Sequence, residues 1–383
     1  IGEVIGTDGA RLSAIVAGAE LDWFLVTKFD SFMHTGAIDL IDFSGAGSGI
    51  DYSMIAGTTI GSVLTSEDSQ GIQHTNISAN RPQPNMPVIE EIVGGGVGLY
   101  DVVVDVQGGS IGSVRSIGPE ADIDWCSFYS ADGMEELISA RDIVDIDMHM
   151  PGTVGVVSAV RDIIGTSIFD NTSRVGAIGT VTAGRDFKNV SYFVAGEIGS
   201  LRVNRDFVDS YLTLQGPAVA NLQSMWVQGD ISGEIVCAGH IGTIISQNGA
   251  ITAAIRTLEN EWDTDVDSIS TTQPFTGTLD LAGDLNAFTV GGPLGENPAE
   301  FGGMTQTLSI AGNLSNMSVD GNLFANLMVG GDIVSLAVDG TIYGQVATNA
   351  DLRSMSVTGD IGGDVGGGLG VRGGLTVLGD LQN

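Results

Sequence analysis

The feature that most constrains the fold is an internal repeat of nine or ten residues. From Gly312 the chain reads GNLSNMSVD, GNLFANLMVG, GDIVSLAVD and GTIYGQVATN, so each unit opens on glycine, a small polar residue and an aliphatic residue. Alternate units keep one spacing: Gly312 and Gly331 lie nineteen residues apart, as do Gly321 and Gly340. A fixed period of this length is typical of chains that stack one supersecondary unit many times. Two of these repeat units therefore form one turn of a solenoid.

The same repeat continues upstream in a variant form. The motif Arg-Asp-Ile or Arg-Asp-Phe takes the place of Gly-Asp-Ile, which shows that the corner does not demand a left-handed backbone. The predicted corner residues are Gly229, Gly239, Gly312, Gly321, Gly331, Gly340 and Gly359, together with Arg141, Arg161, Arg185 and Arg205.

Each repeat unit predicts a short strand rather than a helix. Its sixth and eighth positions are apolar and the seventh is small or polar, which is the two-residue period of a strand. Val, Ile and Thr are common in these stretches and suit a pleated surface. A glycine every nine or ten residues supplies a tight turn and interrupts any helix. The sequence therefore predicts an all-β fold, a parallel β-solenoid with about 19–20 residues per turn.

Some regions break the period. Insertions into solenoids are usually extruded from the side, so we expect lateral loops near residues 64–96, 118–140, 256–275 and 291–305. The solenoid shaft is predicted over residues 53–383, and residues 132–137, within the insertion at 118–140, could hold one short helix. Residues 1–52 follow the repeat loosely and form either a degenerate solenoid or a small β cap.

Charge and cysteine content exclude several classes of protein. The 383 residues include 47 Asp and Glu but only 14 Lys and Arg, which gives a formal charge of −33. Such a field repels nucleic acids and anionic membranes and favours cations, so we expect no nucleic-acid partner. No apolar run is long enough for a transmembrane segment. Two cysteines, Cys126 and Cys237, support neither a disulfide scaffold nor a zinc site, and we expect both to be unpaired.

One acidic segment resembles the start of a calcium-binding loop. Alternate carboxylates are hard oxygen ligands of the kind that Ca²⁺ prefers. However, Ser268 stands where such a loop needs glycine, and Pro274 stands where it needs glutamate. A solvated acidic loop is the alternative. The candidate ligands of a possible Ca²⁺ ion are Glu261, Asp263, Asp265 and Asp267.

The Arg-Asp corners predict stacked ladders of charge along the shaft. They form either a stripe that binds anions or glycans, or a surface network of ion pairs in which the Arg and Asp ladders offset each other. The four histidines fit no Ser/His/Asp or metal-ligand spacing, so no catalytic residue is predicted.

The repeat G-[D/N]-[I/L]-x-x-[L/M]-x-V resembles the shafts of bacterial surface proteins, such as large adhesins and haemagglutinin-like exoproteins. The resemblance implies an extracellular or cell-surface location. Polysaccharide lyases and pectin-degrading hydrolases have a similar cross-section, but they would bring catalytic Asp, Arg or Lys residues together on one sheet.

We therefore expect a non-catalytic structural subunit of an extracellular fibre, sheath or surface layer. Near its end the sequence reads Gly379-Asp380-Leu381, the opening of another repeat unit, which favours a homopolymer built by end-to-end contacts between solenoids. The alternative to a homopolymer is that the chain is one segment of a much longer surface protein. Two alternatives stay open: an adhesin whose loops at 64–96 and 256–275 bind glycans or another ligand, and a polysaccharide lyase or hydrolase of the β-helix type.

Overall fold

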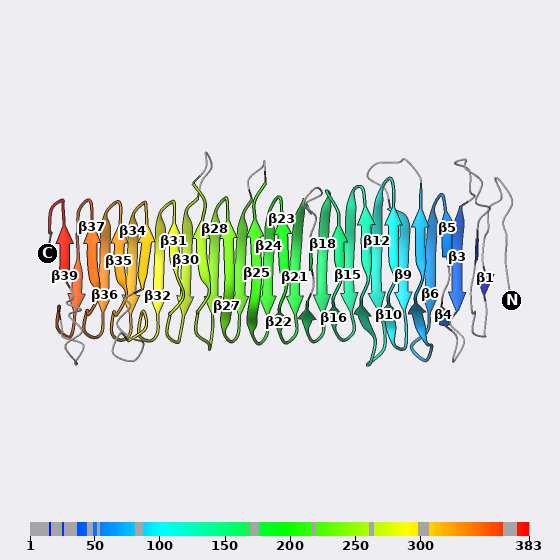
Figure 1. Ribbon diagram of the computed structural model, residues 1–383, viewed down its shortest axis with the longest axis horizontal. Helices are drawn as coiled ribbons and strands as arrows, with labels where there is room; N and C mark the ends of the chain where they lie inside the picture. The colour runs from blue at the N-terminus through cyan, green and yellow to red at the C-terminus, as the bar shows by residue number, and fades with distance from the viewer. Residues whose placement is uncertain are drawn as a thin grey trace. The chain divides into compact units, whose positions relative to one another are not determined.

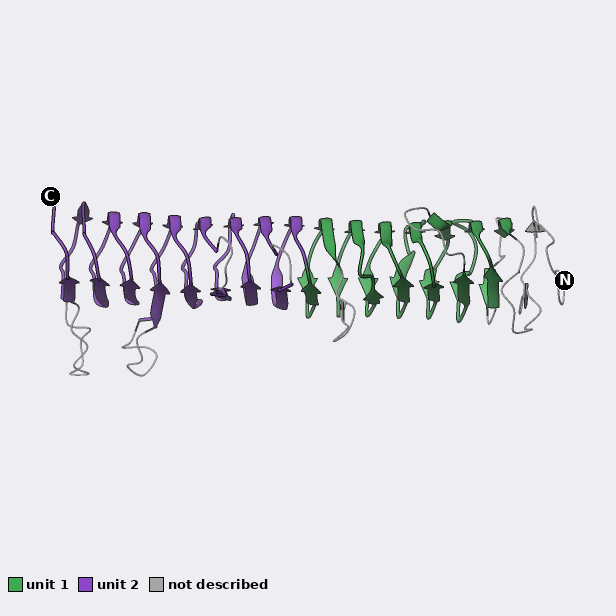
Figure 2. Cartoon of the chain, turned by 90° about the horizontal axis from the view of Figure 1, so that it is seen from above, with its two compact units in different colours: residues 1–195 green, residues 196–383 purple. Residues whose placement is uncertain are grey.

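The computed structural model confirms the predicted fold. The chain is an all-β parallel β-solenoid of about 13 turns, and the described residues contain no helix. It divides into two compact units, residues 1–195 and 196–383, coloured separately in Figure 2. The structure describes residues 15–16, 25–26, 37–43, 49–51, 54–80, 87–165, 167–168, 176–216, 220–259, 264–297, 306–362 and 374–382.

Unit 1 has three rows of parallel strands, so that one turn passes through each row once (Figure 1). The first row contains β1 (Ile15–Val16), β3 (Ile38–Phe43), β6 (Ile60–Thr65), β9 (Pro87–Gly94), β12 (Ser110–Ser116), β15 (Gly133–Ser139), β18 (Thr153–Ala159) and β21 (Ala177–Ala183). The second row contains β4 (Gly49–Asp51), β7 (Gly71–Gln73), β10 (Gly98–Tyr100), β13 (Asp122–Asp124), β16 (Ile143–Val144), β19 (Ile163–Ile164) and β22 (Phe187–Lys188). The third row contains β2 (Leu25–Val26), β5 (Met54–Gly57), β8 (Asn76–Ala79), β11 (Val103–Val106), β14 (Ser127–Ser130), β17 (Asp147–His149), β20 (Ser167–Ile168) and β23 (Ser191–Val194).

Unit 2 simplifies the turn, because single β-bridges replace most strands of the second row. Its first row contains β24 (Ile198–Val203), β26 (Leu222–Val227), β28 (Ile241–Ser246), β30 (Val266–Thr271), β32 (Leu285–Val290), β34 (Leu314–Val319), β36 (Ile333–Val338) and β38 (Met355–Val357). The other strands are β25 (Phe207–Leu214), β27 (Ile231–Cys237), β29 (Ala254–Thr257), β31 (Leu279–Leu281), β33 (Thr307–Ile310), β35 (Asn326–Val329), β37 (Gln345–Thr348) and β39 (Gly374–Val377). The bridges run through Ile251, Phe275, Leu294, Leu323, Ile342 and Ile361.

The turn length varies around the predicted period. Corner residues on successive turns are joined by hydrogen bonds, and their separation gives the turn length. Asn313 and Asp332 are 19 residues apart, and Asp142 and Asp162 are 20 residues apart. The next pair in unit 1, Asp162 and Asp186, is 24 residues apart. The strands stay in register because each turn places the same apolar positions inside.

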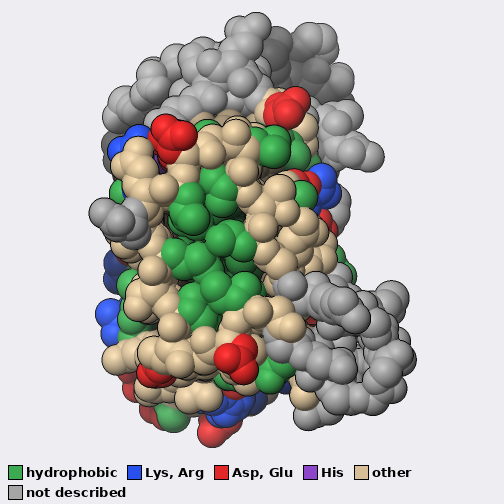
Figure 3. All heavy atoms as spheres, turned by 90° about the vertical axis from the view of Figure 1, so that its left-hand side faces the viewer, with side chains coloured by type: hydrophobic (Ala, Val, Ile, Leu, Met, Phe, Trp, Pro, Cys, Tyr) green, Lys and Arg blue, Asp and Glu red, His purple; other side chains and the backbone are tan. Residues whose placement is uncertain are grey.

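The core consists of apolar ladders along the axis of each unit. The aliphatic residue that follows each corner points inward: Ile123, Ile143 and Ile163 are fully buried in unit 1, as are Leu314 and Ile333 in unit 2. A single turn cannot bury these side chains, whereas stacked turns bury them on both sides. Figure 3 looks at the end of unit 2, where hydrophobic side chains gather in the middle of the face and polar groups surround them.

Two of the predicted lateral loops belong to the solenoid wherever the structure describes them. Residues 64–96 contain β7, β8 and β9, with residues 81–86 outside the described part, and residues 118–140 contain β13, β14 and β15. The predicted helix at 132–137 is also wrong, since these residues belong mostly to β15. The first-row strands β9, β12 and β15 of unit 1 have 8, 7 and 7 residues, whereas β26, β28 and β30 of unit 2 have 6. Of the other two regions, 264–275 and 291–297 also belong to the solenoid, while 260–263 and 298–305 lie outside the described residues.

The described strands of residues 1–52 continue the solenoid pattern. β1 pairs in parallel with β3, β2 with β5, and β4 with β7. The rest of this segment lies outside the described residues. Within the described part of the chain, no helix is long and apolar enough to cross a membrane.

Candidate functional site

The corner aspartates of unit 1 form a hydrogen-bonded ladder. The Asp142 amide donates to Oδ1 of Asp122, the Asp162 amide to Oδ1 of Asp142, and the Asp186 amide to Oδ1 of Asp162, each at 2.9 Å. Asp142, Asp162 and Asp186 are buried. Each carboxylate therefore satisfies a backbone N–H of the next turn at a place where the strands have ended.

Arginines flank this ladder and offset its charge. Arg141 Nε lies 3.2 Å from Asp122 Oδ1 and 3.4 Å from Asp142 Oδ2. Arg185 Nη2 lies 3.3 Å from Asp162 Oδ2, and Arg161 Nε lies 3.6 Å from Asp142 Oδ1. The pKa of Asp122 is raised, because the loss of hydration on burial outweighs the hydrogen bond from the Asp142 amide and the attraction of the Arg141 charge.

The predicted arginine corners do stack. The Arg161 amide donates to the Arg141 carbonyl at 2.8 Å, and the Arg185 amide to the Arg161 carbonyl at 2.7 Å. In unit 2, the Gly229 amide donates to the Arg205 carbonyl at 2.6 Å, so arginine and glycine occupy equivalent corner positions. The contacts of Arg141, Arg161 and Arg185 with the corner aspartates form an ion-pair network along the shaft.

Unit 2 has a different ladder, at the corner before the first row. The Asp284 amide donates to Oδ1 of Asp265, and the Asn313 amide donates to Oδ1 of Asp284, each at 2.7 Å. In the next two turns the Asp332 amide donates to Oδ1 of Asn313 at 2.8 Å, and the Asp351 amide donates to Oδ1 of Asp332 at 3.1 Å. The Asn313 side-chain amide also donates to both carboxylate oxygens of Asp284 at 3.1 Å. The backbone bond from Asp351 is the main cause of a lowered pKa at Asp332, and Arg353 adds to it. An amide residue inserted among the aspartates thus relieves like-charge repulsion.

Close approach between turns explains the glycines of unit 2. A Cβ atom at Gly331 would lie 2.3 Å from Asn313 Oδ1, and one at Gly340 would lie 2.5 Å from the Gly321 carbonyl oxygen. The predicted corners occupy two stacks, one before the first row with Gly239, Gly312 and Gly331, and one before the second row with Gly229, Gly321, Gly340 and Gly359.

The structure separates the described members of the candidate calcium loop. Asp265 Oδ1 accepts the Asp284 amide in the ladder, whereas Asp267 lies in β30, 3.1 Å from His240 Nε2. Glu261 and Asp263 lie outside the described residues. Among described residues, no group of three or more His, Cys, Asp or Glu side chains could hold a metal ion.

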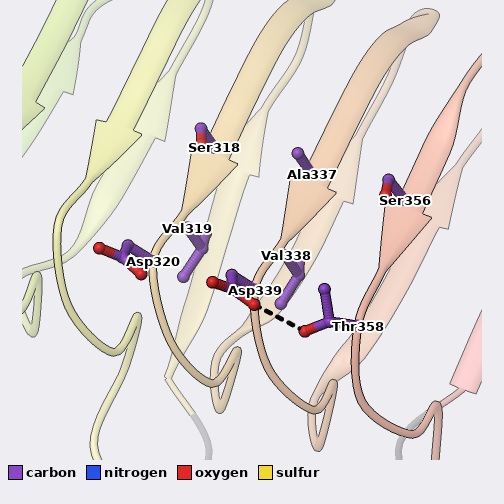
Figure 4. A pocket seen from close by; sticks show the side chains of 8 residues that line it. All are labelled: Ser318, Val319, Asp320, Ala337, Val338, Asp339, Ser356 and Thr358. Carbon is purple, nitrogen blue, oxygen red and sulfur yellow. Dashed lines mark hydrogen bonds between the residues drawn. The ribbon is translucent and has the colours of Figure 1, made fainter.

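A shallow pocket lies at the corner after β34, β36 and β38 (Figure 4). Its volume is about 360 Å³. Asp320 and Asp339 occupy equivalent positions on successive turns, and the Thr358 hydroxyl donates to Asp339 Oδ1 at 2.8 Å. The pocket is lined by Ser318, Val319, Asp320, Ala337, Val338, Asp339, Ser356 and Thr358. It offers hydroxyl groups and carboxylates but no described histidine or lysine.

Sequence reasoning missed a column of residues with left-handed backbone, between the second and third rows of unit 1. This αL column comprises His74 (φ 44°), Asp101 (52°), Trp125 (55°), Asp145 (47°), Gly165 (62°) and Asn189 (54°). Asp, Asn, His and Gly tolerate this conformation better than other residues. The signal is present in the sequence as D-[I/F]-x-[D/N/G], in which the third residue after a corner aspartate turns the chain.

Both cysteines are free and buried. Burial raises the pKa of the Cys126 thiol to about 12 and that of Cys237 to about 11. Both thiols are therefore neutral at physiological pH and behave as small core side chains.

Comparison with known proteins gives no relative: no protein-family model, curated protein or solved structure matches the chain. The candidate roles therefore depend on the geometry of the two units alone.

Proposed function

We propose that the chain is a non-catalytic structural subunit of an extracellular fibre, sheath or surface layer. The observation that supports this role is the use of corner carboxylates as acceptors for backbone N–H groups. Asp142 and Asp162 in unit 1, and Asp284 and Asp332 in unit 2, each bind the amide of the next turn. A carboxylate held this way stabilises the stack instead of serving as an acid or base.

Assembly proceeds through the end face of unit 2. Leu378 and Leu381 are 71% and 66% exposed there, and Ile361 is 49% exposed. β39 pairs with β37 along one edge, and no strand of the described residues pairs with its other edge. That edge is available to a strand of a second copy. A second copy of this chain matches the surface, because a solenoid turn offers backbone groups for pairing and apolar side chains for covering the leucines.

The proposal includes an extracellular location, which is supported by the solenoid fold, the formal charge of −33 and the resemblance of the repeat to those of bacterial surface proteins. The negative charge keeps the sides of the shaft apart and directs association to the apolar end.

Electron microscopy and sedimentation of the purified chain test the proposal. We expect filaments or sheets that grow with protein concentration. The double variant Leu378→Gln/Leu381→Gln should remain dispersed, since it removes apolar surface without changing the charge. Val160→Gln is the control, because Val160 is 65% exposed on the side of unit 1. Particles that stay single at every concentration would exclude self-assembly.

A further inference from the structure

Unit 1 presents two exposed aromatic side chains among three carboxylates on successive turns. This Trp125 patch consists of Tyr100, Asp101, Asp124, Trp125 and Asp145, and Tyr100 is the last residue of β10, a strand labelled in Figure 1. Tyr100 pairs with Asp124 in the second row. The Asp101 amide donates to the Asp124 carbonyl at 3.0 Å, so the αL column places Asp101, Trp125 and Asp145 on consecutive turns.

Trp125 is the exception in its column. Its φ of 55° is unfavourable for a bulky side chain, and its side chain is 62% exposed, so burial does not offset the strain. The other members are His, Asp, Asn and Gly, which suit the conformation. Strained residues that packing does not explain occur preferentially at functional sites.

Among the described residues, no ion pair joins Asp101, Asp124 or Asp145 to a basic side chain. Asp124 Oδ1 is buried and has no hydrogen-bond partner. The charges that act on Asp124 are those of Asp145 and Asp122, and both are negative. Arg141, the corner arginine before β16, is engaged by Asp122 and Asp142. The patch therefore offers acceptors and negative potential next to exposed aromatic rings.

We propose that the Trp125 patch binds the lysine or arginine side chains of a basic peptide segment. Ammonium and guanidinium groups are attracted to the faces of Trp and Tyr, and they donate strong hydrogen bonds to carboxylates. Asp101 and Asp145 are two turns apart, about 10 Å at the spacing of stacked strands. One cation cannot contact both carboxylates at that separation, whereas neighbouring side chains of a peptide reach both.

Binding of a fluorescently labelled peptide of alternating Arg and Gly, followed by anisotropy, tests the site. Trp125→Gly should weaken binding roughly fivefold, the effect of losing one cation–π contact. This variant is expected to fold, because glycine already occupies the same column at Gly165. Asp101→Asn/Asp145→Asn should weaken binding to a similar extent.

Matched controls separate the patch from general attraction by an acidic protein. Asp320→Asn/Asp339→Asn removes the same charge from unit 2, and Tyr211→Ala removes an aromatic side chain that is 54% exposed. Both controls should bind the peptide like the unmodified chain.

Three results would overturn the proposal. If the two double Asp→Asn variants weakened peptide binding equally, the net charge of the protein would explain the binding and the patch would not. Binding of a neutral oligosaccharide at Trp125 in place of the peptide would identify a glycan site. Tetramethylammonium binding as tightly as the peptide, with the same variant dependence, would identify a free organic cation as the ligand.

Discussion

The two ladders differ in how they offset the repulsion between carboxylates stacked on successive turns. In unit 1, the corner aspartates Asp162 and Asp186 are buried, and each directly follows an arginine in the sequence. Before β34 and β36, the ladder is more exposed, glycine precedes Asn313 and Asp332, and asparagine interrupts the aspartates. Stacked carboxylates are thus tolerated in unit 1 through neighbouring cations and in unit 2 through neutral amides and solvent.

This difference predicts which ladder is more sensitive to mutation. Asp162→Ala removes the acceptor of the buried Asp186 amide and leaves Arg185 without its partner, so we expect a loss of about 3 kcal/mol in the free energy of unfolding. Asp284→Ala in the exposed ladder should cost only about 1 kcal/mol. Denaturant unfolding measures both values, and faster hydrogen exchange at Asp186 reports the local effect.

Asp162→Asn is the control, because it keeps an oxygen acceptor and loses the charge. It should fall between Asp162→Ala and the unmodified chain. Equal losses for the two alanine variants would contradict the distinction between a buried and an exposed ladder.

The corners should differ in their tolerance of a side chain. Gly331→Ala places a Cβ atom against Asn313 Oδ1, so we expect a loss of about 2 kcal/mol in the free energy of unfolding. Arg185→Ala in unit 1 removes a partly exposed ion pair and should cost below about 1 kcal/mol. Thermal unfolding of the two variants ranks the effects, and the opposite order would show that corner packing is not the limiting factor in unit 2.

The αL column gives a stabilising substitution. Trp125→Gly relieves the left-handed strain, so the free energy of unfolding should rise by about 1 kcal/mol. Asp209→Gly, at φ 48° in unit 2, should gain less, because aspartate tolerates this conformation. Denaturant midpoints compare the two. A loss of stability in Trp125→Gly would indicate that the indole packs more favourably than its exposure suggests.

The smallest predicted effect concerns pH. Desolvation, followed by the charges of Asp145 and Asp122, raises the pKa of Asp124, so the ionised carboxylate destabilises unit 1 at neutral pH. Asp124→Asn should therefore add a few tenths of a kcal/mol there. The gain should disappear as the pH falls through the raised pKa and below 3.8, where the carboxyl is protonated in both states.

Asp332 should show the opposite sign. Its pKa is lowered by the Asp351 amide and by Arg353, so the ionised form stabilises unit 2 above 3.8. This contribution is lost as the pH falls through the lowered pKa. Asp332→Asn should thus be less stable than the unmodified chain at neutral pH and equal to it in strong acid. Unfolding curves at several pH values distinguish the two aspartates.

The regular half of the fold was predictable from the sequence. The Gly-Asp-Ile corners, the alternating apolar positions and the nineteen-residue period led to the parallel solenoid, and the structure buries the aliphatic corner residues Leu314 and Ile333. The longer turns of unit 1 misled the prediction, because added residues look the same in sequence whether they form a loop or lengthen a strand. β15, expected to begin as a helix, follows this pattern, since its neighbours β12 and β18 impose an extended register.

The candidate sites were harder to predict. Asp265 and Asp267 are alternate residues, and in a strand such residues share a face, but the corner before β30 directs Asp265 into the ladder. Trp125 was not recognised, because its importance depends on a backbone conformation and an exposure that neighbouring turns create.

The sequence by itself determined the stacking of turns, since a short periodic pattern of glycine, aspartate and aliphatic residues satisfies both the corner and the core. Only the tertiary structure decided what each polar residue does. A corner carboxylate accepts a hydrogen bond from a backbone amide 19 to 29 residues away, and that separation depends on how the strands pair. Its burial, its charge partners and its availability to a ligand are therefore properties of neighbouring turns, which local sequence does not specify.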